Sequence, residues 1–165
     1  MKSAFFVMLF ALSAFAQEQW STVVAPCGPK ATSFEVKLDE SKHTIGQPET
    51  GKALVYFVQD FGEMSCIGKC GPTRIGLDGN WVGANQHNSY FSVSVDPGEH
   101  HVCANMGKTL LAFAQFTAEA GKLYYFRTRS FSGKYQHVFD LDPLDGDQAK
   151  YLIYSYPVSV SHSKP

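Results

Sequence analysis

Tight-turn signals between short apolar runs constrain the fold of this 165-residue chain more than any other feature. The dipeptide Asp78-Gly79 separates two strand-like runs, and a type I′ turn needs positive φ angles that Asp-Gly adopts at little cost. The triplets Asp96-Pro97-Gly98 and Glu119-Ala120-Gly121 separate further runs in a similar way. Because these links are so short, they predict antiparallel neighbouring strands.

The runs between these turns have the composition and the alternation of β-strands. They are rich in β-branched and aromatic residues, and at residues 90–95 apolar side chains alternate with serines. Nine such runs predict a mainly β fold, a single antiparallel β-sandwich. The predicted strands are residues 32–38, 53–59, 73–77, 81–84, 90–95, 100–104, 110–117, 123–129 and 136–141.

The C-terminal part predicts one short helix followed by a tail. Asp145 or Asp147 can cap a helix that runs to Ser155, and Pro157 would end it. Residues 159–165 are polar and lie at the end of the chain, where order is often lost. We therefore expect a flexible tail there.

Residues 1–16 have the pattern of a cleavable secretory signal peptide. Lys2 precedes an apolar run at residues 4–15, which ends in a small-x-small triplet. The run is shorter than the roughly 18 apolar residues that a membrane-spanning helix needs. We therefore expect cleavage near Ala16 and a periplasmic or secreted protein without stable membrane insertion. Residues 17–158 would form a single β-sandwich domain, a common domain size.

All four cysteines follow the predicted signal peptide. An even number of cysteines in an oxidising compartment indicates disulfide bonds, and three pairings are possible. Cys66 and Cys70 can close a short loop through Gly68, which would leave Cys27 to pair with Cys103. We predict these two bridges and expect them to stabilise the fold, since their spacing differs from that of redox-active Cys-x-x-Cys pairs.

Charge and motifs exclude several classes of function. The formal net charge is −1 and no block of like charge occurs, so we expect neither nucleic acid nor an anionic membrane as partner. The sequence contains no Gly-x-Ser-x-Gly elbow, phosphate loop, dinucleotide fingerprint or His-Glu-x-x-His motif. His100 and His101 are adjacent in a predicted strand, where neighbouring side chains face opposite ways. No catalytic residue, metal site or cofactor is therefore predicted.

One short region combines an aromatic side chain with several polar ones. Trp81 directly follows the predicted hairpin turn, and the residues around it are rich in amides. Aromatic rings on a β-sandwich can stack on sugars or pack against partner proteins. The predicted binding rim consists of Asn80, Trp81, Asn85, His87 and Asn88.

Several motifs, in this order, resemble one bacterial family. They are GKALVY at 51–56, IGLDGNWVG at 75–83, YF at 90–91, DPGEH at 96–100 and AGKLYYFR at 120–127. The order resembles the exported family catalogued as domain of unknown function 2846, and its middle is similar to the hairpin units of PEGA domains. The resemblance covers about residues 51–130. It implies a small immunoglobulin-like or PEGA-like β-sandwich at the bacterial envelope, with no assigned activity and no catalytic residues.

Two hypotheses from different functional classes follow. The first is a non-enzymatic envelope module that binds a protein or a glycan, and the second is a small exported hydrolase without a recognised motif. A cleft with a paired nucleophile and base would favour the hydrolase. An exposed aromatic patch over a closed core would favour the binding module, which is the function we expect.

Overall fold

The computed structural model describes residues 27–29, 32–62, 71–107, 110–132 and 137–164. All nine strands predicted from the sequence are present, with small shifts at their ends. A helix and a tenth strand follow them. The elements are β1 Ser33–Asp39, β2 Ala53–Gln59, β3 Thr73–Leu77, β4 Asn80–Asn85, β5 Ser89–Val95, β6 Gly98–Met106, β7 Leu110–Ala118, β8 Leu123–Ser132, β9 His137–Pro143, α2 Gly146–Ser155 and β10 Val158–Lys164.

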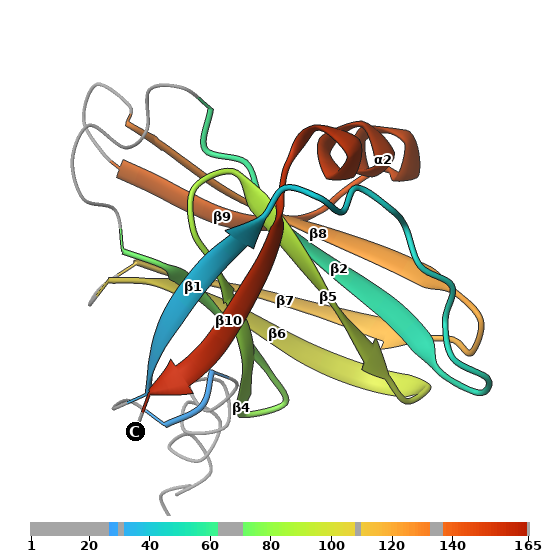
Figure 1. The fold of residues 1–165 in the computed structure, drawn as a ribbon. Coiled ribbons are helices and arrows are strands. Elements are labelled where there is room, and N and C mark those ends of the chain that lie inside the picture. The colour runs from blue at the N-terminus through green and yellow to red at the C-terminus, as the bar shows by residue number, and fades with distance from the viewer. Residues whose placement is uncertain (1–26, 30–31, 63–70, 108–109, 133–136, 165) are drawn as a thin grey trace, which may run out of the picture.

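The strands form two sheets that pack face to face, with the helix as a third layer. Sheet A has the strand order β1-β10-β5-β2-β8-β9, and sheet B has the order β4-β3-β6-β7. Figure 1 shows α2 on the side of sheet A that faces away from sheet B. The predictions of a mainly β fold, of two packed sheets and of one C-terminal helix are therefore confirmed.

The prediction of a purely antiparallel sandwich is wrong, because sheet A is mixed. Strand β2 pairs with β8 in parallel, and β10 pairs with β5 in parallel. A tight turn fixes the relative direction of consecutive strands but does not decide whether they pair. Strands that are distant in the sequence become neighbours in sheet A, and no local turn constrains their relative direction.

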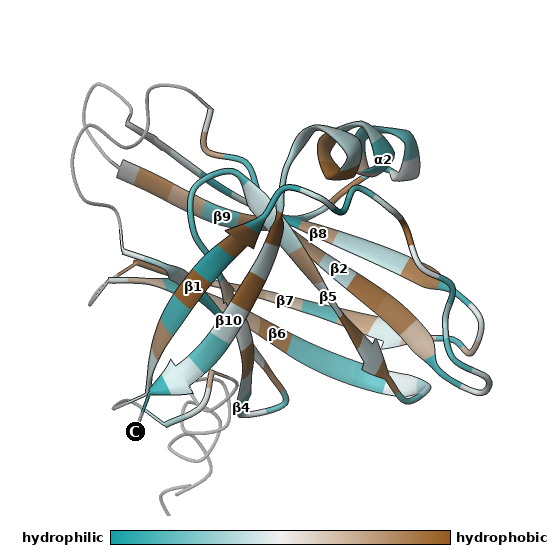
Figure 2. Ribbon diagram, in the orientation of Figure 1, coloured by the Kyte–Doolittle hydropathy of each residue, from teal (hydrophilic) through white to brown (hydrophobic). Residues whose placement is uncertain are grey.

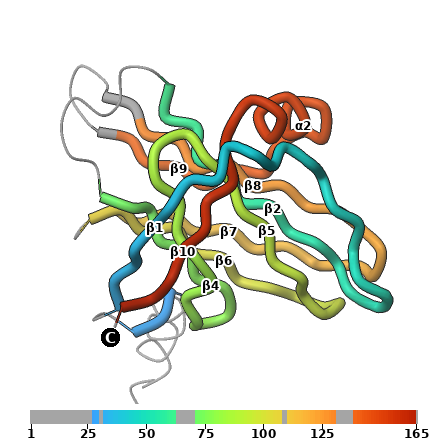
Figure 3. Tube along the Cα trace, in the orientation of Figure 1, coloured from blue at the N-terminus to red at the C-terminus, as the bar shows by residue number. Residues whose placement is uncertain are grey.

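The three predicted turns have different roles. Asp78 and Gly79 have φ angles of 50° and 80°, so they form the expected type I′ turn of the β3–β4 hairpin. The turn at 96–97 joins β5 of sheet A to β6 of sheet B, and the turn at 119–122 joins β7 of sheet B to β8 of sheet A. The prediction of paired neighbours at these two turns is wrong, because each turn joins strands of different sheets; the path of the chain can be followed in Figure 3.

Hydrogen bonds and one ion pair hold these two crossing turns at the start of β2. Gly121 N donates to Lys52 O over 2.8 Å, and Leu54 N donates to Lys122 O over 3.0 Å. The Lys52 ammonium contacts the Asp96 carboxylate at 2.9 Å. The two sheets are thereby connected at this end of the sandwich by turns that contact a shared segment.

Strand β2 is buried on both faces, which explains its continuous apolar sequence. Its inward residues, such as Phe57, join the core between the sheets, while Tyr56 and its outward neighbours pack under α2. Figure 2 shows this apolar strand beneath the helix. A strand covered on both faces needs apolar side chains at successive positions, without the usual alternation.

Helix α2 begins and ends as the sequence predicts. The Asp145 carboxylate accepts hydrogen bonds from Asp147 N at 2.9 Å and Gln148 N at 3.3 Å, so Asp145 is the N-cap. Ala149, Leu152 and Ile153 are buried against sheet A.

Among the described residues, no helix is long and apolar enough to cross a membrane.

The prediction of a flexible tail at 159–165 is wrong for residues 159–164. They belong to β10, which pairs with β1 along its whole length. Ser159 Oγ donates to Ala84 O at 2.7 Å, and Ser161 Oγ accepts from Ala84 N at 3.0 Å. The serines therefore bind the backbone of the edge strand β4, a role that polar composition alone does not reveal.

The structure confirms one of the two predicted disulfides. Cys27 is bonded to Cys103, with 5.1 Å between their Cα atoms. The predicted Cys66–Cys70 bridge and the predicted signal peptide at 1–16 lie outside the described residues.

Candidate functional site

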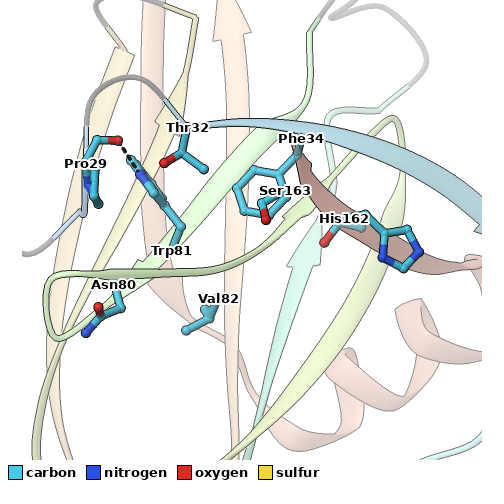
Figure 4. A pocket seen from close by; sticks show the side chains of 9 residues that line it. Pro29, Thr32, Phe34, Asn80, Trp81, Val82, His162 and Ser163 are labelled. Atoms are coloured by element: carbon cyan, nitrogen blue, oxygen red, sulfur yellow. Dashed lines mark hydrogen bonds between the residues drawn. The ribbon is translucent and has the colours of Figure 1, made fainter. Parts of the chain in front are cut away.

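An open cleft of about 560 Å³ lies between the start of β4 and the β1/β10 pair. Figure 4 shows Trp81 on one side of the cleft and Phe34 on the other. Three short segments that are far apart in the sequence therefore build this surface. The lining residues are Pro29, Thr32, Phe34, Asn80, Trp81, Val82, Ser161, His162 and Ser163.

Trp81 is held in place by the N-terminal segment. Its indole Nε1 donates to Pro29 O at 2.8 Å. Trp81 lies opposite Gly76 on β3, and Gly76 lies opposite Cys103 on β6. A side chain at Gly76 would overlap the carbonyl of Cys27, so glycine at this position lets the N-terminal segment lie directly on the sheet.

The guanidinium of Arg74 packs against the indole ring of Trp81. The guanidinium carbon lies 4.5 Å from the centroid of the indole ring, which is a cation–π contact. The guanidinium also donates to Thr32 O and to the side-chain oxygen of Asn105, at 3.1 Å from Nε. Burial lowers the pKa of Arg74 below its ordinary value. These contacts fix the indole ring before any ligand arrives.

The opposite wall comes from the two terminal strands. Phe34 on β1 lies opposite Ser163 on β10, so the two side chains share the face that looks toward β4. Ser161 lies two residues before Ser163, so its side chain is on the same face of β10. The side chain of His162, between the two serines, leaves the strand on the opposite face. The cleft thus combines two aromatic rings with hydroxyl and amide groups.

The five residues of the predicted rim do not lie together. Asn80 and Trp81 line the cleft at the start of β4. At the other end of β4, Asn85 is fully buried and its Nδ2 donates to Phe57 O at 3.0 Å. Asn88 accepts from Phe61 N at 3.0 Å, and His87 lies exposed in the β4–β5 link with a φ of 57°. Both asparagines therefore hold the backbone.

A second polar group of residues surrounds His100 on β6. His100 Nδ1 lies 2.6 Å from Asp78 Oδ2, and Nε2 lies 2.8 Å from Asp96 O. Burial alone would lower the pKa of His100, but the hydrogen bonds to Asp78 and Asp96 O raise it above its ordinary value. Since both ring nitrogens have acceptors, the protonated imidazolium satisfies both. This arrangement connects two turns and leaves no ring nitrogen for proton transfer.

Among the described residues, no group of three His, Cys, Asp or Glu side chains could hold a metal ion. Of the cleft residues, the sequence predicted only Asn80 and Trp81. The ones it missed are Pro29, Thr32, Phe34, Val82, Ser161, His162 and Ser163. Phe34 alternates with polar neighbours in β1, which was a usable signal. The pairing of β1 with β10 had no local signal, because the two strands are separated by most of the chain.

Comparisons with known proteins relate the chain to one family. Neither the curated proteins nor the solved structures contain a match. The family model described as "Protein of unknown function (DUF2846)" matches residues 49–141, which is more than half of the chain. These residues run from just before β2 into β9 and include most of both sheets. The chain therefore belongs to the DUF2846 family, as its turn and strand motifs predict.

Proposed function

We propose that this DUF2846 protein is an exported, non-enzymatic module of the bacterial envelope that binds a glycan in the cleft between Trp81 and Phe34. The observation that carries the proposal is the pair of aromatic side chains on opposite walls of an open cleft whose other groups are mainly hydroxyls and amides. Aromatic rings provide apolar faces for sugar rings, and hydroxyl and amide groups can bind sugar hydroxyls.

Preorganisation supports binding at Trp81. The ring is fixed by its hydrogen bond to Pro29 O and by the guanidinium of Arg74. A side chain that is already ordered loses little entropy when a ligand binds, so more of the contact energy contributes to affinity. Asn80 is exposed beside it and can donate and accept hydrogen bonds at the edge of a sugar.

The cleft extends beyond the region that matches the family model. Asn80, Trp81 and Val82 lie inside the region that matches the family, whereas Phe34 and the β10 residues lie outside it. The cleft therefore forms where the matched region meets two strands that lie outside it, β1 and β10. A PEGA-like unit would be a series of hairpins. The β3–β4 hairpin supports this likeness, but the turn at Pro97 does not, because it joins strands of different sheets.

The hydroxyl groups of the cleft support a binding function over hydrolysis. Ser161 Oγ already accepts a hydrogen bond from the backbone nitrogen of Ala84 on β4. His162 extends from the other face of β10 than its serine neighbours, which keeps its ring from serving as their base. His100, which does have a carboxylate partner, has both nitrogens engaged elsewhere.

Export is supported by the Cys27–Cys103 disulfide, because such bonds persist in oxidising compartments. Expression of the full chain with its own N-terminus should yield protein processed near Ala16 in the periplasm or the medium. N-terminal sequencing of the product measures this directly. Recovery of the unprocessed chain from the membrane fraction would contradict export by a cleaved signal.

Tryptophan fluorescence tests glycan binding, because the chain has two tryptophans. In a Trp20→Phe variant, Trp81 is the single tryptophan and reports on the cleft. Titration with N-acetylglucosamine oligomers and with peptidoglycan fragments should change its emission in a saturable way. We expect Phe34→Ala to weaken binding about tenfold, equivalent to about 1.4 kcal/mol.

The matched control is Tyr151→Ala, which removes an aromatic side chain that is 72% exposed on α2, away from the cleft. This variant should bind as the parent protein does. Absence of saturable binding by any glycan, or equal loss in the two variants, would overturn the proposal. Binding of a purified envelope protein that competes at Trp81 would assign the cleft to a protein partner instead.

A further inference from the structure

A cluster of polar side chains lies between the two sheets, where β2 ends and β3 begins. Each of its members is at most 1% exposed, although the core cluster between the sheets consists of apolar side chains. No member carries a charge. The interior polar cluster consists of Gln59, Thr73, Asn85, Ser89 and Thr128.

The strand registers place these side chains on facing surfaces. In sheet A, Gln59 lies beside Ser89 of β5 and Thr128 of β8, and it continues the inward face of β2 that includes Phe57. In sheet B, Thr73 lies opposite Asn85 and continues the inward face of β3. Both sheets therefore contribute polar groups to the same interior region.

Direct hydrogen bonds already connect the two sheets within this cluster. Asn85 Nδ2, from sheet B, donates to Phe57 O of sheet A at 3.0 Å. Ser89 Oγ, from sheet A, donates to Asn85 Oδ1 at 3.5 Å. Thr128 Oγ1 donates to Val58 O at 3.4 Å. These contacts hold Asn85 of sheet B against β2 and β5 of sheet A, beside the register positions of Thr73 and Gln59.

Three polar atoms of the cluster have no hydrogen-bond partner within the part of the chain that the structure describes. They are Nε2 and Oε1 of Gln59 and Oγ1 of Thr73. A buried polar atom without a partner destabilises a fold, because it loses its hydrogen bonds to water and gains none in return. Native proteins satisfy such groups, commonly with a buried water that makes two to four hydrogen bonds.

We propose that Gln59 and Thr73 form an internal binding site for water, which bridges sheet A and sheet B. The amide of Gln59 offers one group that donates and one that accepts, and the Thr73 hydroxyl can do either. Because the cluster is neutral, its chemistry suits a small neutral molecule and not an ion. Water is the smallest molecule that both donates and accepts hydrogen bonds, and it satisfies atoms from both sheets at once.

Water–protein NOE and ROE spectroscopy of the isotope-labelled mature protein tests the site. We expect cross-peaks between water and the Nε2 protons of Gln59 that have opposite signs in the two experiments, the signature of a long-held water. Proton exchange would give the same sign in both. Cross-peaks that are absent, or that show only exchange, in the wild-type protein would overturn the proposal without any variant.

Two variants locate the water. Thr73→Val removes one proposed hydrogen-bonding partner at nearly constant volume, and we expect it to abolish or strongly reduce the water cross-peaks at Gln59. Gln115→Met changes an exposed glutamine on β7 and should leave them unchanged. Retention of full cross-peak intensity in Thr73→Val would overturn the bridge between the sheets. If Thr73→Val fails to fold, Thr73→Ser keeps the hydroxyl and must retain the cross-peaks.

Discussion

At the scale of single residues, the turn between β3 and β4 depends on two backbone conformations that most side chains avoid. Asp78 and Gly79 both have positive φ angles. We expect Gly79→Val to lower the free energy of unfolding by about 1–3 kcal/mol, because a β-branched residue is strained at positive φ. Urea denaturation measures the change. Gly79→Asn is the control, since Asn tolerates this conformation and should cost much less.

His100 gives the fold a dependence on pH. Burial opposes protonation, yet the contacts with Asp78 and Asp96 O raise the pKa of His100 in the folded state. A raised folded pKa means that protonation stabilises the fold. The contribution is complete below the unfolded value of 6.5 and is lost as the pH rises through the folded pKa.

We therefore expect the wild-type protein to lose stability relative to His100→Gln as the pH rises from the unfolded value of 6.5 through the raised folded pKa, a range in which carboxylates stay ionised. Urea denaturation at several pH values measures the difference. His101→Gln is the matched control, because His101 is exposed on the other face of β6, and it should keep the wild-type slope. Parallel pH profiles for wild type and His100→Gln would refute the assignment.

At the scale of the elements, the sequence predicts strands and turns well and strand partners poorly. The alternation in β5, the Asp78-Gly79 turn and the Asp145 cap are local signals, and the structure confirms each of them. The parallel partners of β2 and β10 depend on which sheet each strand enters. That choice depends on packing between distant segments, which no short motif encodes.

For the same reason, only part of the candidate site could be predicted from the sequence. Asn80 and Trp81 follow the hairpin turn, so a local signal identified them. Phe34 and Ser163 reach the cleft only because β1 and β10 pair across most of the chain length. The amides Asn85 and Asn88 looked like ligand-binding groups in the sequence, but they hold the backbone at the far end of β4.

Strand β10 should contribute to stability, contrary to the tail that the sequence predicts. Deletion of residues 159–165 removes most of the ladder to β1 and the two serine contacts with Ala84. We expect the free energy of unfolding to fall by at least about 2 kcal/mol, since each lost hydrogen bond contributes about 0.5–1.5 kcal/mol. Deletion of Pro165 alone is the control. Equal thermal stability of the two truncated proteins would contradict a structural role for β10.

At the scale of the whole molecule, the N-terminal segment links the outer face of sheet B to the edge of sheet A. The disulfide fixes Cys27 on β6, Pro29 contacts Trp81 on β4, and the chain then enters β1. Stability and the geometry of the cleft are therefore coupled, because the segment that closes the long covalent loop also holds the indole ring.

The Cys27–Cys103 bridge spans 76 residues, and a loop of that length restricts the unfolded chain strongly. We expect the double variant Cys27→Ser/Cys103→Ser to lower the free energy of unfolding by about 2–5 kcal/mol. In the Trp20→Phe background it should also change Trp81 emission, because the Pro29 contact loses its anchor. The matched control is Cys66→Ser/Cys70→Ser, which should cost less if these residues close their short predicted loop. Non-reducing peptide mapping checks the pairing, and a Cys27–Cys66 linkage would contradict it.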